Sequence, residues 1–203
     1  MAKPSWLSVS PASGSGNGTI SNTSPAHTGR IKREGVVTVQ GSGVTNADTY
    51  QVIQPPLAEF VKYDDTDGNI AVSKDGGKVT ITGKSNSAKL TFAWVGSNNG
   101  VSLPTSYTAA GQTTSNGASI SGDPGAVAEY EWNIVLTFPS NETTSTVERT
   151  LKVTAGGGQT AQIKLNQTAG DAYLSVTPTE ITIPQEGGTV TVQVTSNTSW
   201  TVS

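Results

Sequence analysis

The chain has 203 residues, of which 30 are Thr, 23 Ser and 23 Gly, and its formal net charge is −3. Val and Ile together number 30, against only 8 Leu. Branched side chains of this kind suit a pleated sheet, whereas a Gly-rich, Leu-poor chain does not sustain amphipathic helices. The composition therefore predicts an all-β protein made of several small sandwiches with thin cores.

Several classes of site are excluded by residue types that are rare or missing. The chain has no Cys and one His, His27, which excludes disulfides, thiolate zinc sites, Cys nucleophiles and any site that needs two imidazoles. An acidic chain with only three Arg does not predict a nucleic-acid-binding surface. No stretch approaches the roughly 18 apolar residues of a membrane span. The opening MAKPSWLSVSP lacks the apolar core of a secretion signal, so we expect a protein that stays in the cytoplasm where it is made.

In chain order, the first strong signals are strands at 36–39 (VVTV) and 50–54 (YQVIQ). The second of these strands ends at Gln54, and Phe60 follows six residues later. Gln167 and Tyr173 repeat this spacing 113 residues further along the chain. A fixed offset of this length indicates repeated structural units. New modules are therefore expected to begin near residues 58 and 171.

The next elements belong to a middle module. A DGG turn at 75–77 leads into VTITG, and the matching EGG turn at 186–188 leads into VTVQV, as expected for tight hairpins between alternating strands. Leu90, Phe92 and Trp94 form one apolar stripe. Residues 96–127 are polar and Gly-rich, and we expect long loops with two weak strands there. The strongest predicted strand covers 129–138 and places five apolar side chains on one face: Tyr130, Trp132, Ile134, Leu136 and Phe138.

These elements predict tandem immunoglobulin-like β-sandwich modules. The expected boundaries are 1–56 for an N-terminal β module, 57–170 for a complete module, and 171–203 for the incomplete start of a third. A half-sandwich buries little apolar surface and leaves sheet edges unpaired. We therefore expect a homo-oligomer, strand exchange between copies or docking against the middle module, or else completion by further sequence.

Two segments carry a family resemblance. GGTVTVQVTSNTSWTVS at 187–203 resembles the first half of a BACON domain (Bacteroidetes-associated carbohydrate-binding often N-terminal). SWLSVSPASGSGNGTI, the Arg33-to-Gly35 motif, VVTV and YQVIQ resemble the second half of that domain, while the middle module matches more loosely. The resemblance implies a β-sandwich fold in which residues 1–56 are the second half of one module and residues 171–203 the first half of another. It also implies that Trp6 and Trp200 pack inside the sandwich.

Two groups of polar residues are candidates for a metal site and for an acid–base pair, but each has a simpler interpretation. Asp65, Asp67 and Asn69 alternate around Gly68 as in calcium loops, but no bidentate Glu follows at the expected spacing. The sequence favours a solvated turn there. Glu129 and Glu131 lie two positions apart on one strand, yet the aromatic side chains of that strand point the other way, so a polar outer face is favoured over catalysis. We expect no catalytic residue and no cofactor.

The four Trp residues suggest a glycan site, because exposed indole rings stack on sugars. Trp132 belongs to a long apolar stripe and is expected in the core. Trp94, next to the loop VGSNNG, is the one candidate for a surface platform. His27 is expected to be a solvated loop residue.

Two functions from different classes follow. Tandem Gly-Ser-Thr-rich modules that open at Met1 look like the accessory proteins that decorate heads or form fibres of tailed phages of gut bacteria. That resemblance implies a virion protein on the capsid surface, assembled in the bacterial cytoplasm. Its N-terminal module would bind the major capsid protein, and its outer modules would adhere weakly to host or mucin glycans.

The alternative is a carbohydrate-binding or spacer portion of a secreted bacterial glycan-degrading enzyme, and a fragment with no function of its own is a third option. An enzyme within these residues is not expected, because no nucleophile, base and orienting group occur at recognisable spacing.

Overall fold

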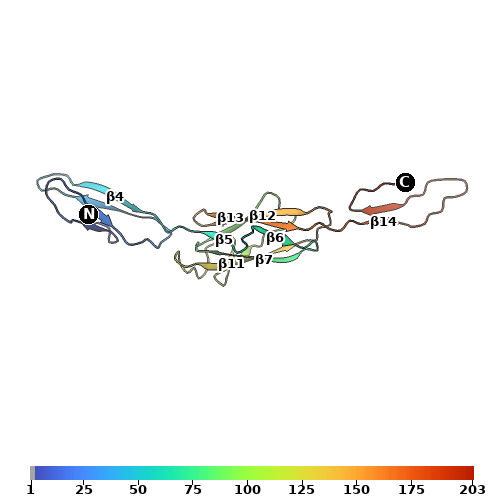
Figure 1. Ribbon diagram of the computed structural model, residues 1–203, viewed down its shortest axis with the longest axis horizontal. Coiled ribbons are helices and arrows are strands. Elements are labelled where there is room, and N and C mark those ends of the chain that lie inside the picture. Colours follow the sequence, from blue (N-terminus) through green and yellow to red (C-terminus); the bar gives the residue numbers. More distant parts are fainter. Residues whose placement is uncertain (1–2) are drawn as a thin grey trace.

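The protein is all-β, and its strands fall into three groups along an elongated molecule (Figure 1). The computed structural model describes residues 3–203, and no helix occurs among them. The N-terminal group lies at one end, the middle group forms a sandwich, and the C-terminal group lies at the opposite end (Figure 1). No sheet contains strands from two of these groups.

The first segment, residues 1–56, contains two separate antiparallel hairpins. β1 (Ser8–Ser10) pairs with β2 (Ser21–Thr23), and β3 (Arg33–Val39) pairs with β4 (Asp48–Gln54). Leu7 and Val37 are its buried large hydrophobic residues. Two two-stranded sheets with so few buried side chains make a very thin core, as the composition predicted.

The middle segment, residues 57–170, forms a complete sandwich of two sheets. One sheet has the order β10-β9-β11-β7-β5, and the other has the order β6-β13-β12-β8. The strands are β5 (Val61–Tyr63), β6 (Asn69–Val72), β7 (Gly77–Ser85), β8 (Leu90–Val95), β9 (Ser106–Ala109), β10 (Gln112–Ser115), β11 (Tyr130–Phe138), β12 (Val147–Ala155) and β13 (Thr160–Gln167). β6 leaves the sheet of β5 and pairs in parallel with β13, while the other neighbours are antiparallel. This is an immunoglobulin-like β-sandwich.

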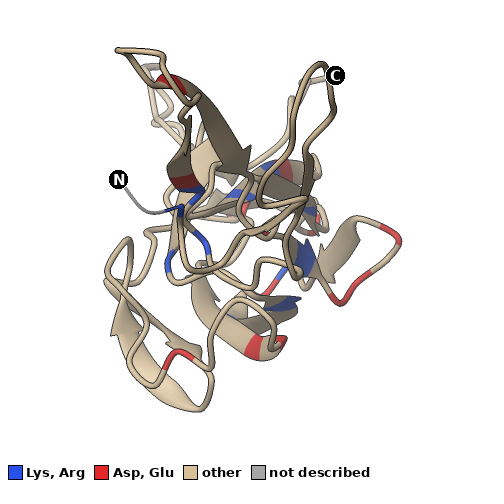
Figure 2. Cartoon of the chain, turned by 90° about the vertical axis from the view of Figure 1, so that its left-hand side faces the viewer, with Lys and Arg blue, Asp and Glu red and all other residues tan. Residues whose placement is uncertain are grey.

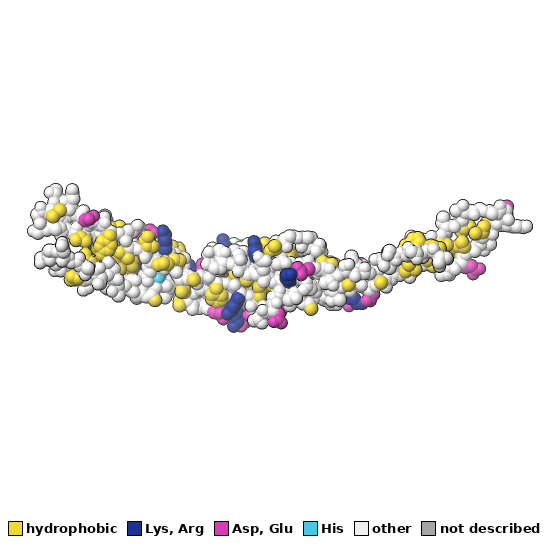
Figure 3. Space-filling model, turned by 45° about the horizontal axis from the view of Figure 1, so that its top comes forward, with side chains coloured by type: hydrophobic (Ala, Val, Ile, Leu, Met, Phe, Trp, Pro, Cys, Tyr) yellow, Lys and Arg dark blue, Asp and Glu magenta, His cyan; other side chains and the backbone are white. Residues whose placement is uncertain are grey.

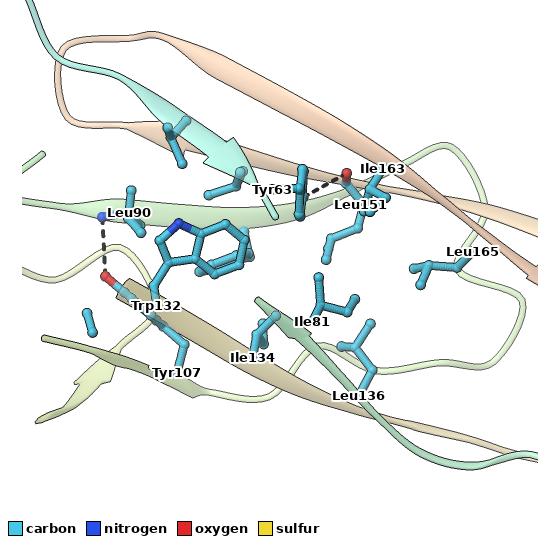
Figure 4. Close-up of a cluster of buried hydrophobic side chains, with 14 of the residues drawn as sticks. Tyr63, Ile81, Leu90, Tyr107, Trp132, Ile134, Leu136, Leu151, Ile163 and Leu165 are labelled. Atoms are coloured by element: carbon cyan, nitrogen blue, oxygen red, sulfur yellow. Dashed lines mark hydrogen bonds between the residues drawn. The ribbon is translucent and has the colours of Figure 1, made fainter. Parts of the chain in front are cut away.

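Trp132 lies at the centre of the sandwich core (Figure 4). Its ring meets those of Tyr63 and Phe92 edge to face, both at centroid distances of 5.3 Å. The Tyr63 hydroxyl donates a hydrogen bond to the Leu151 carbonyl at 3.0 Å, which links the two sheets. The stripe predicted on residues 129–138 is confirmed, because all five of its apolar side chains are buried.

The loop region 96–127 contains β9 and β10, which are the two weak strands expected there. β9 pairs with β11 and extends its sheet. Tyr107 of β9 is buried, and its hydroxyl accepts a hydrogen bond from the Leu90 amide at 3.2 Å (Figure 4). The polar loops are therefore anchored on the core by an aromatic residue.

The last segment, residues 171–203, contains one short pair of strands, β14 (Leu174–Thr177) and β15 (Gln193–Ser196). These strands repeat the pairing of β5 with β7. Val61 lies opposite Ser85 in the middle module, and Leu174 lies opposite Ser196 in the last segment. The same module start is therefore built twice, in the same register.

Side-chain hydrogen bonds repeat as well. Asn86 Oδ1 accepts a hydrogen bond from the Phe60 amide at 2.8 Å, and Asn197 Oδ1 accepts one from the Tyr173 amide at 3.0 Å. In both copies, the side-chain amide of the Asn also donates to the carbonyl two residues before the aromatic, at 3.1 and 2.8 Å. The internal repeat detected in the sequence is therefore present in the hydrogen bonding of the fold.

The first segment repeats the end of the middle module. Gln54 closes β4, and its Nε2 donates to the Pro25 carbonyl at 2.9 Å. Gln167 closes β13, and its Nε2 donates to the Pro139 carbonyl at 2.7 Å. In each module the Pro lies just after a strand of the opposite sheet, β2 or β11. The first segment therefore has counterparts of β11, β12 and β13.

An Arg accompanies the terminal Gln in both copies. Arg33 donates to Oε1 of the Gln of β4 at 2.8 Å, and Arg149 donates to Oε1 of the Gln of β13 at 3.1 Å. Each guanidinium group also lies over an aromatic ring, that of Trp6 at 4.6 Å and that of Phe138 at 5.3 Å. Cation–π stacking adds to the hydrogen bonds and holds each Arg in place.

Candidate functional site

The loop proposed as an alternative calcium site is an exposed turn. The Asp67 amide donates to Asp65 Oδ1 at 3.0 Å, so this carboxylate caps the backbone of its own turn. Asn69 starts β6 and accepts a hydrogen bond from Asn166. Within residues 3–203, no group of three or more acidic or His side chains is placed to hold a metal ion. Asp65, Asp67 and Asn69 therefore form a solvated turn.

Trp94, the candidate for a glycan platform, packs partly against the sandwich core. It lies on β8 opposite Leu151, its ring is partly buried, and it packs against the sandwich core. Its Nε1 is buried without a hydrogen-bond partner among the described residues. Part of the Trp94 ring is accessible, so a glycan platform at this position stays a prediction.

Glu129 and Glu131 lie on the outer face, as expected. The Glu129 carboxylate contacts Lys62 at 3.2 Å and Lys84 at 3.3 Å. The hydrogen bond from Lys62, followed by that from Lys84, holds the pKa of Glu129 below its ordinary value. A carboxylate with a lowered pKa is a poor general acid at neutral pH, and Glu129 forms a surface ion cluster with Lys62 and Lys84.

His27 lies in the loop before β3 and is partly buried rather than fully solvated. Its Nε2 lies 2.6 Å from the Ile31 carbonyl, and its Nδ1 accepts a hydrogen bond from the Gly29 amide at 3.5 Å. Both ring nitrogens are engaged by nearby backbone, so His27 shapes the loop that carries Arg30.

A polar depression of about 520 Å³ lies at the C-terminal end of the middle module, beside Arg149. Arg149 is buried, and burial lowers the pKa of its guanidinium group. It donates to the carbonyls of Asn98 and Asn99 at 2.9 and 3.0 Å, in addition to Gln167. The guanidinium group of Arg149 thus donates to neutral oxygen atoms. These hydrogen bonds hold the loop after β8 against the sheet that contains β12.

The two outer segments expose apolar side chains that the middle module buries. Ile183 is 56% exposed, whereas its counterpart Val72 is 2% exposed. Val192 is 39% exposed, whereas its counterpart Ile81 is 1% exposed. Yellow patches on both end segments in Figure 3 show this surface. In the end-on view of Figure 2, the charged residues are scattered and form no single-sign face. The open ends of the outer segments are the candidate functional site.

The two Trp residues expected inside sandwiches differ in environment. Trp6 is partly buried and its ring lies under Arg33. Trp200 is half exposed, so its expected place in a core is wrong within this chain. The reason is that β14 and β15 have no second sheet facing them among the described residues.

The outer segments contact the middle module through residues that no sequence pattern had paired. Arg30 of the first segment donates to both carboxylate oxygens of Asp123 and to the Asn86 carbonyl of the middle module. At the other junction, Lys74 pairs with Asp171 and the Asn197 amide donates to the Glu142 carbonyl at 2.9 Å. The chain has only three Arg residues, and Arg30 lies in a polar loop. An Arg in such a place can donate two hydrogen bonds to one carboxylate, and this was the signal in the sequence for a specific contact.

No protein-family model matches the chain, and no curated protein matches it. Among solved structures, it is similar to a Bacteroides ovatus GH5 xyloglucanase in complex with a XXXG heptasaccharide, with 16% identity, a TM-score of 0.34 and coverage of 56% of this chain and 20% of that chain. A Bacteroides thetaiotaomicron protein solved by NMR matches with 20% identity, a TM-score of 0.30 and coverage of 56% and 91%. Domains 4–9 of the surface layer protein SbsC match with 12% identity, a TM-score of 0.36 and coverage of 81% and 28%.

This chain therefore spans about a fifth of the xyloglucanase, and these low scores carry no argument about its function. No helix in the described part of the chain is long and apolar enough to cross a membrane.

Proposed function

We propose that this chain is a structural protein of a phage virion, either decorating the capsid surface or forming a head fibre. The observation that carries the proposal is the arrangement of its modules. Three β units follow one another along the molecule, and the two outer units expose apolar side chains (Figures 1 and 3). Such a rod suits a protein that links other proteins, because each end offers a binding face.

The middle module supports a spacer role. Its hydrophobic core is complete. Charges on its surface are paired, as Glu129 is with Lys62, and the guanidinium group of Arg149 donates to a carbonyl of the loop after β8. A surface of this kind keeps the two ends apart. In the proposal, the N-terminal segment attaches to the major capsid protein, and the outer modules adhere weakly to glycans with avidity from many copies.

The test is co-purification of the chain with phage particles through a density gradient, followed by binding of purified chain to the major capsid protein. We expect a fixed stoichiometry with that protein and direct binding. Absence from particles would refute the proposal. If glycan arrays then gave micromolar binding, the chain would instead be assigned as a carbohydrate-binding or spacer portion of a secreted glycan-degrading enzyme.

A further inference from the structure

Arg149 is a buried cation without a counter-ion. Its side chain is only 4% exposed, yet it forms no ion pair with any carboxylate of residues 3–203. Arg30, by contrast, is paired with Asp123, and Arg33 is only partly buried, so water reaches its charge. Transfer of an ion out of water is costly, so a buried charge normally has an oppositely charged partner or ligand. The environment of Arg149 therefore favours an added negative charge.

The guanidinium group of Arg149 also has donors to spare. A guanidinium group carries five N–H donors. Three of them are used, because Nε donates to the Asn98 carbonyl, Nη2 to the Asn99 carbonyl and Nη1 to Gln167 Oε1. Each of the two terminal nitrogen atoms thus keeps one N–H without a partner among residues 3–203. A pair of N–H groups on one guanidinium matches the two oxygen atoms of a carboxylate or phosphate group.

These donors lie beside open space. Arg149 lines the polar depression of about 520 Å³ at the end of the sandwich, where the last segment follows the middle module (Figure 1). Its walls come from the loop between β11 and β12, the loop after β8, and the ends of β12 and β13. Hydroxyl and amide side chains dominate these walls: Asn99, Ser140, Asn141, Thr143 and Thr146. The volume lies within the range of small-molecule sites, which is roughly 300–1,000 Å³.

Two carboxylates line the same depression, and neither neutralises Arg149. The Glu148 carboxylate contacts Lys164 at 3.1 Å, and the Glu142 carboxylate accepts a hydrogen bond from the Ser140 hydroxyl. Glu148 is thus compensated by its own partner. Glu142 has no cationic partner within residues 3–203, so its charge opposes the entry of an anion. This opposition makes Glu142 a useful position for a test.

We propose that the depression beside Arg149 binds an oxyanion group, a carboxylate or a phosphate, carried by a small polar ligand such as an acidic or phosphorylated sugar. The two free N–H groups of the guanidinium donate to the oxyanion and neutralise its charge. The hydroxyl and amide groups of the walls, such as Thr146, are placed to meet the hydroxyl groups of the ligand. The inference does not depend on the virion assignment.

The experiment is an NMR titration of the full-length chain, labelled with nitrogen-15, at low ionic strength. The probes are glucuronate, glucose 6-phosphate and glucose. We expect the two anionic sugars to shift the amides of Thr146 and Val147, which line the depression, and glucose to leave them unchanged. Tighter binding of glucuronate would identify the preferred group as a carboxylate, and tighter binding of glucose 6-phosphate would identify it as a phosphate. Added salt should weaken either interaction.

Glu142→Gln tests the sign of the charge that the site prefers. The substitution removes the opposing carboxylate and retains the backbone carbonyl that Asn197 contacts. Binding of the better anionic probe should therefore tighten at least about threefold. Glu131→Gln is the matched control, because Glu131 is an exposed carboxylate on β11 that does not line the depression. It should leave binding unchanged.

Arg149→Lys tests the guanidinium group itself. Lys keeps the positive charge but loses the paired N–H groups, so binding should weaken at least about tenfold. If this variant fails to fold, Glu142→Gln and its control decide the matter. The proposal would be overturned by the absence of amide shifts at millimolar anionic sugar, by equal shifts with glucose, or by equal binding to the Glu142→Gln and Glu131→Gln variants.

Discussion

The guanidinium group of Arg30 contacts both carboxylate oxygens of Asp123, at 2.5 and 2.8 Å, although 93 residues separate them in the sequence. The same side chain donates to the Asn86 carbonyl at 2.6 Å. This bidentate contact is the main polar clamp between the first segment and the middle module. It fixes the direction in which the first open end points.

Loss of this clamp should loosen the joint between segments without unfolding either one. Arg30→Gln removes the charge, and we expect a broader distribution of molecular lengths in small-angle X-ray scattering. The stability of the middle module should fall by less than about 1 kcal/mol, because the contact is partly exposed. Lys32→Gln, which removes the exposed pair with Glu34, is the matched control and should leave the scattering unchanged.

Acid should weaken the same joint. The hydrogen bond from Arg30 holds the pKa of Asp123 below its ordinary value of 3.8. A group with a lowered pKa in the folded protein contributes stability that is present above the ordinary pKa and is lost as the pH falls through the folded pKa. The scattering profile should therefore broaden at a pH below 3.8. Asp123→Asn should already be broad at neutral pH and should lose this pH dependence.

Alkali should destabilise the middle module through its buried Tyr residues. Burial raises the pKa of Tyr130 to about 12, and its hydroxyl donates to the Ser87 carbonyl at 2.7 Å. The neutral phenol is thus favoured in the folded protein, so its stability is present below the ordinary value of 10.0 and declines as the pH rises toward 12. Denaturant midpoints should fall above pH 10.0, and this fall should be smaller in Tyr130→Phe.

Gly83 should not tolerate a side chain. A Cβ at this position would lie 2.2 Å from the Lys62 carbonyl oxygen and 2.2 Å from Trp132 Cζ2. Backbone and a packed indole cannot both move aside, so Gly83→Ala should lower the free energy of unfolding by about 3 kcal/mol. Gly14→Ala, where no atom lies within 4 Å, should be neutral in the same denaturation measurement.

The repeated Asn residues should differ in importance. Asn86 is buried and its third hydrogen bond, to the Ala126 carbonyl at 2.9 Å, lies within the middle module, whereas Asn197 is partly exposed and its third bond goes to the Glu142 carbonyl at the junction between segments. Asn86→Ala should therefore destabilise the middle module by about 2 kcal/mol, since buried partners are left unsatisfied. Asn197→Ala should leave the core of that module intact, speed amide exchange at Tyr173 and remove the contact with the Glu142 carbonyl. Equal global destabilisation by both substitutions would contradict the difference in burial.

Local patterns in the sequence predicted the parts of the fold that depend on neighbouring residues. The alternation from Tyr130 to Phe138 identified the central strand, and the EGG turn before β15 has Gly187 and Gly188 at positive φ as expected. The recurrence of Gln54 at Gln167 revealed the repeat, and the hydrogen bonds of both residues bear it out. These features follow from side-chain periodicity and turn chemistry, which act over a few residues.

Contacts between distant residues were decided by the tertiary structure alone. No local pattern pairs Arg30 with Asp123, and the spacing of Trp94 does not show how far the core covers its ring. The sequence around Trp200 predicts a core residue, yet its side chain is half exposed. The sequence by itself determined which face of each strand is apolar. Only the tertiary structure decided which of those faces meet a partner, because burial depends on what else occupies the space beside the strand.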